Sequence, residues 1–122
     1  LKFIFVDFHA EATSEKVAMG HHLDGRVSAV VGTHQHIPTA DGHILPGGTA
    51  YQTDAGMCGD YNSIIGMNKE PILERFLGMK SKSKFSPALG EATLCGVVIE
   101  SDLETGLAKT IEPIKIGGVL GK

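Results

Sequence analysis

The chain has 122 residues, of which 42% are hydrophobic, and this length and composition suit a single globular domain with one small core. Its formal net charge is −3 and only 6% of its residues are aromatic, so it has neither the basic surface nor the stacking platform of a nucleic-acid-binding protein. No apolar run approaches the roughly 20 residues that span a bilayer, and no leader pattern is recognisable, so we expect a cytoplasmic protein that binds neither duplex DNA nor a membrane.

The first third of the chain has the pattern of a strand, a helix and a second strand. Residues 2–8 contain a short apolar run typical of a strand that is covered on both faces. Thr13 or Ser14 is suited to cap a helix that ends near Gly25. A second β-branched run follows at 27–33. Such a unit predicts two parallel strands joined by a right-handed crossover.

Histidines follow both of these strands. His9 comes directly after the first, and His34 and His36 come after the second. The carboxyl ends of parallel strands lie at the same edge of a sheet, so we expect the three imidazoles to converge. A His-x-His pair alone is equally typical of a solvated surface pair, but three converging imidazoles favour a metal site, with Zn, Mn, Fe or Ni rather than Ca or Mg.

The middle of the chain begins as a loop and continues into a third strand. Turn signals in 38–48 place His43 in a solvated loop. Residues 49–54 alternate as a strand does, and a glycine-bounded loop follows. Asp54 and Asp60 are candidates for orienting the imidazoles through their second ring nitrogen, and ordinary loop solvation is an equally good interpretation of both.

A second helix and an edge strand are expected next. Asn68 is suited to cap a helix that ends at Gly78. Its apolar stripe, which we expect to be core, consists of Ile72, Leu73, Phe76 and Leu77. Residues 79–87 are predicted as a strand whose alternate lysines protect an exposed edge, and a phosphate contact is the alternative. These lysines are Lys80, Lys82 and Lys84.

The last part of the chain predicts a hairpin. Residues 91–101 and 107–116 are β-prone, and the five residues between them contain a glycine near the end of the turn. The glycine-rich tail that follows predicts no particular structure. Cys58 and Cys95 lack C-x-x-C spacing, so we expect two thiols rather than a disulfide, with Cys95 in the core.

Several long motifs closely resemble the YmdB-like family of bacterial calcineurin-like metallophosphoesterases. The resemblance runs through the whole chain and rests on Val6-Asp7-Phe8-His9-Ala10-Glu11-Ala12-Thr13-Ser14-Glu15-Lys16, on residues 23–36, on Thr39-Ala40-Asp41, on residues 44–51 and on Thr53-Asp54-Ala55-Gly56-Met57-Cys58-Gly59. It implies an α/β fold in which this chain is half of a four-layer α/β/β/α sandwich, with the βαβ unit and the carboxyl-terminal hairpin within that half.

The resemblance also implies an activity and a ligand set. Members hydrolyse phosphoesters, including 2′,3′-cyclic nucleotides, at a site with two divalent cations such as Mn, Fe or Zn. His9, His34 and His36 match the family's metal ligands in the second half of the domain, and no residue of this chain matches a catalytic role. The family's remaining Asp, Glu-Asn and Asn-His motifs do not occur in residues 1–122. We therefore expect this chain to be the carboxyl-terminal half of one domain whose amino-terminal half is absent, with a small phosphoester as substrate.

Two other functions compete with this hypothesis. A His-x-His amidohydrolase would need further Lys or His ligands at later strand ends, and no histidine follows His43. A metal-binding or oligomer-forming module without catalysis is the main alternative. Half of a sheet exposes apolar faces and unpaired strand edges, so we also expect a homo-oligomer.

Overall fold

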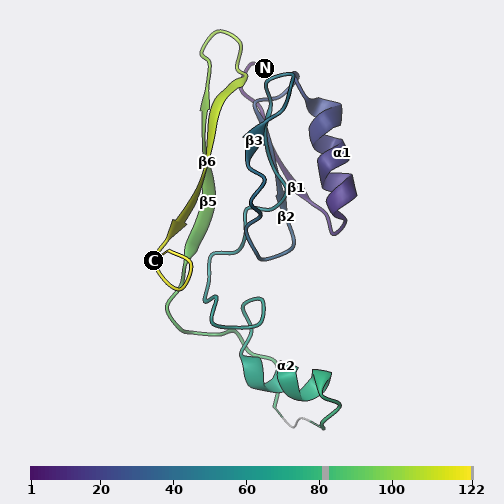
Figure 1. The fold of residues 1–122 in the computed structure, drawn as a ribbon, viewed down its shortest axis with the longest axis vertical. Coiled ribbons are helices and arrows are strands. Elements are labelled where there is room, and N and C mark those ends of the chain that lie inside the picture. Colours follow the sequence, from purple (N-terminus) through teal and green to yellow (C-terminus); the bar gives the residue numbers. More distant parts are fainter. Residues whose placement is uncertain (81–82, 122) are drawn as a thin grey trace. The chain divides into compact units, whose positions relative to one another are not determined.

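The computed structural model describes residues 1–80 and 83–121 and divides into two compact units (Figure 1). The first unit consists of Leu1–Gly56 and Cys95–Ile114. The second consists of the described residues of Met57–Leu94 and Lys115–Lys122. The candidate site belongs to the first unit.

A sheet of four strands forms the centre of the first unit. Its order is β1 (Phe5–His9), β2 (Ala29–Thr33), β4 (Ala50–Gln52) and β3 (His43–Ile44). β1, β2 and β4 run parallel, and the two-residue β3 runs antiparallel to β4. The predicted βαβ crossover is thus confirmed. β3 lies in a segment that we predicted as loop, because two residues between turns carry no detectable periodicity.

β2 is one of the two inner strands and is buried on both faces, from Ala29 to Gly32. β1 differs from the prediction, because its residues alternate between half-buried and exposed and Phe5 is 57% exposed. β1 lies at the edge of the sheet, where only the face with Val6 and Phe8 packs against the core cluster. An apolar run therefore identified both strands but did not distinguish the covered strand from the edge strand.

Helix α1 (Thr13–Leu23) lies along one side of the sheet, and the hairpin lies on the other side (Figure 1). Val17, Met19 and Leu23 pack against the core cluster, which consists of Val27, Val30, Leu45 and Tyr51. Ala12 is the N-cap residue, and no side chain caps the helix, so the prediction of a Thr13 or Ser14 cap is wrong. The helix starts one residue earlier than a side-chain cap at Thr13 would place it.

The hairpin consists of β5 (Leu94–Ser101) and β6 (Ala108–Ile116), as predicted. Hydrogen bonds from Asp102 N to Leu107 O and from Gly106 N to Asp102 O close its turn. The hairpin is joined to the sheet region, because Ala108 N donates to Gly48 O at 2.9 Å and Ser28 Oγ donates to Gly106 O. Cys95 is buried, Cys58 is exposed and the two form no disulfide, as expected.

The second unit contains α2 (Lys69–Phe76), with Asn68 at its N-cap and no side-chain capping bond. Ile72 is buried, but Leu73, Phe76 and Leu77 are 48%, 83% and 74% exposed, so the prediction that the stripe is core is wrong for these three. Within this unit the helix buries only Pro71 and Ile72, because no described sheet covers its apolar face.

The edge strand predicted at 79–87 is not a strand in the described residues of that range. The structure shows one isolated bridge there, between Met67 and Pro87. Lys82 lies outside the described residues, so the structure does not test its place in the pattern. Across residues 1–80 and 83–121, no helix is both long and apolar enough to cross a membrane. These residues form a mixed α/β fold that combines a mostly parallel sheet with a hairpin.

Candidate metal centre

The candidate site lies at the carboxyl ends of the three parallel strands. His9 is the last residue of β1 and pairs in register with Thr33, the last residue of β2. His34 therefore follows one residue beyond the end of β2, beside His9. Asp54 comes two residues after β4 ends at Gln52. This edge is where ligands bind in open parallel sheets, since the loops after the strands diverge there.

His9 and His34 are brought together as the sequence predicted. His34 Nδ1 lies 3.2 Å from His9 Nε2, and the ring centroids are 5.1 Å apart with the planes at 78°. Both side chains are exposed to solvent. One of the two facing nitrogens must carry the hydrogen of this bond, and a cation that replaces that hydrogen would meet two lone pairs.

Two successive hydrogen bonds hold the second ring nitrogen of His9, Nδ1. His9 Nδ1 lies 3.0 Å from Thr33 Oγ1, which donates to Asp7 Oδ1 at 3.3 Å. A carboxylate only accepts hydrogen bonds, so the Thr33 hydroxyl uses its hydrogen on Asp7 and accepts from His9 Nδ1–H. This arrangement leaves the lone pair of Nε2 directed toward His34. Metal-binding histidines are commonly oriented in this way through their second nitrogen.

The loop that carries the two other imidazoles has an unusual backbone. His34 has φ 141° and His36 has φ 66°, a region that L-residues other than glycine rarely adopt. Ile65 is the only other non-glycine residue with positive φ in the described part of the chain. Backbone conformations of this kind cost about 1–3 kcal/mol each and concentrate at functional sites.

The donor set fits a metal ion in part. With Zn–N bonds of about 2.0–2.1 Å, two nitrogens on one tetrahedral ion lie about 3.4 Å apart, close to the 3.2 Å between His9 and His34. Among residues 1–80 and 83–121, however, no group of three or more His, Cys, Asp or Glu side chains is arranged to hold an ion. His36 is exposed in the same loop, and its role as a third ligand stays a prediction.

The other polar residues that the sequence singled out have other partners. The Asp54 carboxylate accepts hydrogen bonds from Lys16 Nζ and from the backbone N–H groups of Gln35 and Gly56. Asp60 accepts from the backbone N–H groups of Asn62 and Gly90. The Asp54 side chain thus holds the histidine loop through the backbone N–H of Gln35. Asp60 stabilises a turn in the second unit.

Lys16 was missed by the sequence analysis. It is completely buried and reaches Asp54, although the helix pattern gave no reason to place a lysine inside. A usable signal was present, because Lys16 and Gly20 are one turn apart and together form the buried face of α1. A charged residue beside a helical glycine on the covered face indicates a specific partner.

Asp41 forms a second polar network at the β3–β4 side of the sheet. It accepts from Thr39 Oγ1, Thr53 Oγ1 and Thr53 N. Burial alone would raise the pKa of Asp41, but these hydrogen bonds together lower it below its ordinary value.

Tyr51 lies next to this network, and its hydroxyl group bonds to Thr53 Oγ1. Burial is the main cause that raises the pKa of Tyr51, and the charge of Asp41 raises it further. Exposed His43 stacks edge-on against Tyr51.

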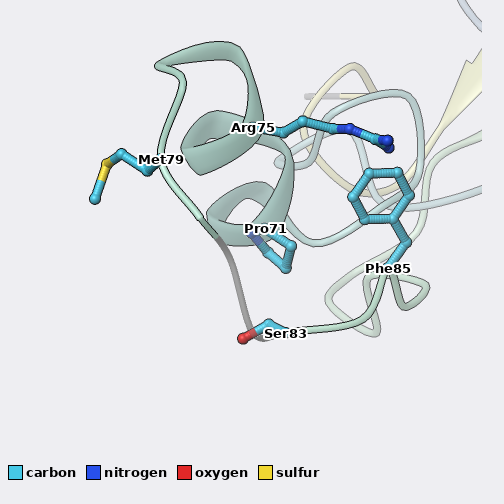
Figure 2. A pocket seen from close by; sticks show the side chains of 5 residues that line it. All are labelled: Pro71, Arg75, Met79, Ser83 and Phe85. Carbon is cyan, nitrogen blue, oxygen red and sulfur yellow. The ribbon is translucent and has the colours of Figure 1, made fainter.

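The second unit contains an open hollow of about 260 Å³ (Figure 2). Its lining residues are Pro71, Arg75, Met79, Ser83 and Phe85. The Arg75 guanidinium lies 5.3 Å from the centre of the Phe85 ring. Among the described residues, the lining contains one cation and no carboxylate or imidazole, so these residues offer no metal-binding set.

The sequence of the chain is similar to those of a known protein family and of a curated enzyme. Residues 1–114 match the family described as YmdB-like protein. Over 114 residues the chain is 56% identical to a 2′,3′-cyclic-nucleotide 2′-phosphodiesterase from Bacillus subtilis (strain 168), a match that covers 93% of this chain and 43% of that enzyme. The chain thus spans less than half the length of this curated relative.

Two solved structures have a similar fold. A phosphatase from Mycoplasma pneumoniae superimposes with a TM-score of 0.84 at 44% identity, over 92% of this chain and 40% of that one. A hypothetical protein from Thermus thermophilus superimposes with a TM-score of 0.83 at 46% identity, over 97% of this chain and 46% of that one.

Proposed function

Because the chain belongs to the YmdB-like family, we propose that it forms part of the active site of a metal-dependent phosphoesterase. Its substrates would be phosphodiesters and phosphomonoesters, with 2′,3′-cyclic nucleotides among them. The observation that carries this proposal is the 3.2 Å approach of His9 and His34 at the carboxyl edge of the sheet. The names of the Bacillus and Mycoplasma relatives support the same reaction class.

Three residues of this chain would hold metal. His9 would bind through Nε2 and His34 through Nδ1, since these nitrogens face each other, and His36 would add a third imidazole from the same loop. When bound, divalent cations such as Mn, Fe or Zn supply charge for the phosphoryl oxygens and activate a water for attack on phosphorus. Thr33 and Asp7 would keep His9 in the tautomer that presents Nε2.

The proposal includes a division of the site between two halves of one domain. Residues 1–122 would be the carboxyl-terminal half of a four-layer α/β/β/α sandwich, in keeping with the 40–46% of the relatives' lengths that the chain covers. Three imidazoles are too few for two cations, so the remaining ligands and the general acid would come from the other half.

The alternative is a metal-binding or oligomer-forming module without catalysis. It is favoured by one observation, namely that no group of three or more His, Cys, Asp or Glu side chains is arranged to hold an ion in the described part of the chain. Two imidazoles can bind one cation but leave at least half of its coordination positions open to water.

The experiment compares this chain with a version extended at its amino terminus. Bound metal is measured after incubation with Mn²⁺ and desalting, and turnover is measured with bis(p-nitrophenyl) phosphate and with a 2′,3′-cyclic nucleotide. We expect hydrolysis only by the extended version. In that version His9→Ala or His34→Ala should lower turnover by at least about 100-fold, because losing even the partners of metal ligands costs 10–100-fold.

His43→Ala is the matched control, since His43 is an exposed histidine of the same unit. Its turnover should equal that of the unchanged extended protein. Metal binding without turnover in both lengths of chain would favour the non-catalytic alternative. Turnover that survives His34→Ala would contradict the proposed ligand set.

A further inference from the structure

A buried ion pair lies beneath the histidine loop. Lys16 Nζ and Asp54 Oδ2 are 3.3 Å apart, and the two side chains are 0% and 1% exposed. Lysine and aspartate are almost never buried this completely unless they are paired, because removing a charge from water is costly. A buried pair contributes little net stability compared with apolar residues of similar volume, so a gain in stability does not account for it.

Both members of the pair hold the residue between the two predicted ligands of the loop. Asp54 Oδ2 accepts the backbone N–H of Gln35 at 2.7 Å, and Lys16 Nζ donates to Gln35 Oε1 at 3.2 Å. The bond from Gln35 N is short, as expected for a charge-assisted hydrogen bond. Gln35 is thereby held by its backbone and by its side chain, with His34 and His36 on either side of it.

The start of the loop is held by close packing against the same lysine. A Cβ at Gly32 would lie 2.7 Å from Lys16 Cδ and would overlap the carbonyl oxygen of Thr53. Ala55 N also donates to Gly32 O at 2.9 Å. The stem of Lys16 and the chain after β4 therefore hold the loop where it leaves β2.

We propose that the Lys16–Asp54 ion pair is a positioning device for the candidate metal centre. It holds His34 and His36, on either side of Gln35, in their positive-φ conformations and so presents His34 Nδ1 to His9 Nε2. Strained backbone persists only where the surroundings over-determine it, and the ion pair supplies fixed bonds at Gln35 for that purpose. Lys16 and Asp54 are positioning residues, since they bind Gln35 and act through the loop, and the link to metal binding rests on the function proposed above.

The test removes both charges together and leaves the shape nearly unchanged. The double variant Lys16→Met/Asp54→Asn avoids an unpaired buried charge and keeps an acceptor for the N–H of Gln35. Folding is monitored by the dispersion of methyl resonances. In the metal-free chain we expect the variant to lose the nuclear Overhauser effect between the His9 and His34 rings and to shift the His34 ring signals. The ring signals of His21 and His22, at the far end of α1, should stay in place.

Cobalt binding supplies a second measurement. Titration followed by visible absorption should show a loss of roughly 10–100-fold in Co²⁺ affinity, the range for residues that orient metal ligands. The matched control is Lys109→Met/Glu112→Gln, which removes an exposed lysine and an exposed carboxylate from β6 of the same unit. It should change neither the ring contacts nor the affinity.

The outcomes separate this inference from the proposed function. If the unchanged chain binds no Co²⁺, the metal proposal fails, and the ring contacts still decide whether the ion pair positions His34. If the double variant keeps the His9–His34 contact and the His34 shifts, the positioning role is overturned. If the variant does not fold, hydrogen exchange on the unchanged chain decides instead. Strong protection of the Gln35 amide supports the role, and exchange at the random-coil rate overturns it.

Discussion

The tautomer of His9 depends on a single hydroxyl group. Thr33 Oγ1 lies between His9 Nδ1 and the Asp7 carboxylate, and these bonds direct the lone pair of Nε2 toward His34. Thr33 is also a strand residue, so one side chain serves both the sheet and the site. Valine at this position keeps the shape and the β-branching but removes the bonds.

We expect Thr33→Val to weaken Zn²⁺ binding by roughly 10–100-fold, because the His9 ring loses the partner that fixes its tautomer and orientation. Affinity is measured by competition with a chromophoric chelator. Thr110→Val, at an exposed position of β6, is the control and should leave the affinity unchanged. Equal affinity in both variants would show that Thr33 does not orient His9.

A pH effect on stability is expected from Asp41. Its hydrogen bonds from Thr39 and Thr53 overcome burial and lower its pKa in the folded chain. A lowered folded pKa contributes stability that is complete above the ordinary pKa of the carboxyl group and is lost as the pH falls through the lowered value. Asp41→Asn should therefore show a smaller loss of unfolding free energy on acidification.

The measurement is urea unfolding at a series of acidic pH values. Glu104→Gln, which removes a carboxylate from an exposed turn, serves as the control and should follow the unchanged chain. A parallel fall in stability for Asp41→Asn and the unchanged chain would refute the contribution assigned to Asp41.

At the scale of elements, the site depends on how closely β2, α1 and the segment after β4 approach one another. Gly32 ends the buried part of β2, and Lys16 from α1 passes against it. Gly20 similarly lets α1 approach Tyr51 of β4, since a Cβ there would lie 2.7 Å from the ring. Glycine at these contacts permits a close packing that any side chain would prevent.

Gly32→Ala should destabilise the chain by about 1–3 kcal/mol, the usual cost of overpacking, because the added carbon meets backbone that cannot easily move. Urea unfolding measures this loss. The control is Gly96→Ala in β5, where the added carbon would lie 3.6 Å from Ile114, an ordinary contact. It should be neutral or stabilising by about 0.4–1 kcal/mol. Equal stability of the two variants would contradict the close approach at Gly32.

At the scale of the whole molecule, each unit leaves apolar surface uncovered. In the first unit, edge residues Phe3 and Phe5 are more than half exposed. In the second, Phe76 and Leu77 are the most exposed residues of the α2 stripe, and Phe76 also lines a mostly apolar hollow of about 520 Å³. Exposed apolar patches of this kind commonly mark surfaces that another protein surface covers.

We expect the isolated chain to self-associate through this apolar surface. In sedimentation equilibrium, the double variant Phe76→Ser/Leu77→Ser should have a lower average molar mass than the unchanged chain at the same concentration. In this variant, burial of the apolar stripe no longer favours association. Leu103→Ser removes an apolar side chain of similar exposure from the hairpin turn and should leave association unchanged. Identical masses for all three chains would contradict a role of the α2 stripe.

Much of the fold and part of the site were predictable from sequence. Apolar runs at 2–8 and 27–33 located β1 and β2, and the rule for parallel strands then placed His9 beside His34. The hairpin and the state of both cysteines were also predicted correctly. Each of these results depends on local periodicity or on a general rule of chain connection, which a single sequence contains.

Only the tertiary structure decided what covers each face and which polar groups meet. Periodicity assigned Leu73 and Phe76 to one side of α2, but whether that side is buried depends on elements distant in the sequence. The Lys16–Asp54 pair joins residues 38 positions apart, and a helix pattern cannot reveal such a partner. The sequence by itself thus determined the strand ends where the imidazoles meet, whereas long-range packing decided how their loop is held.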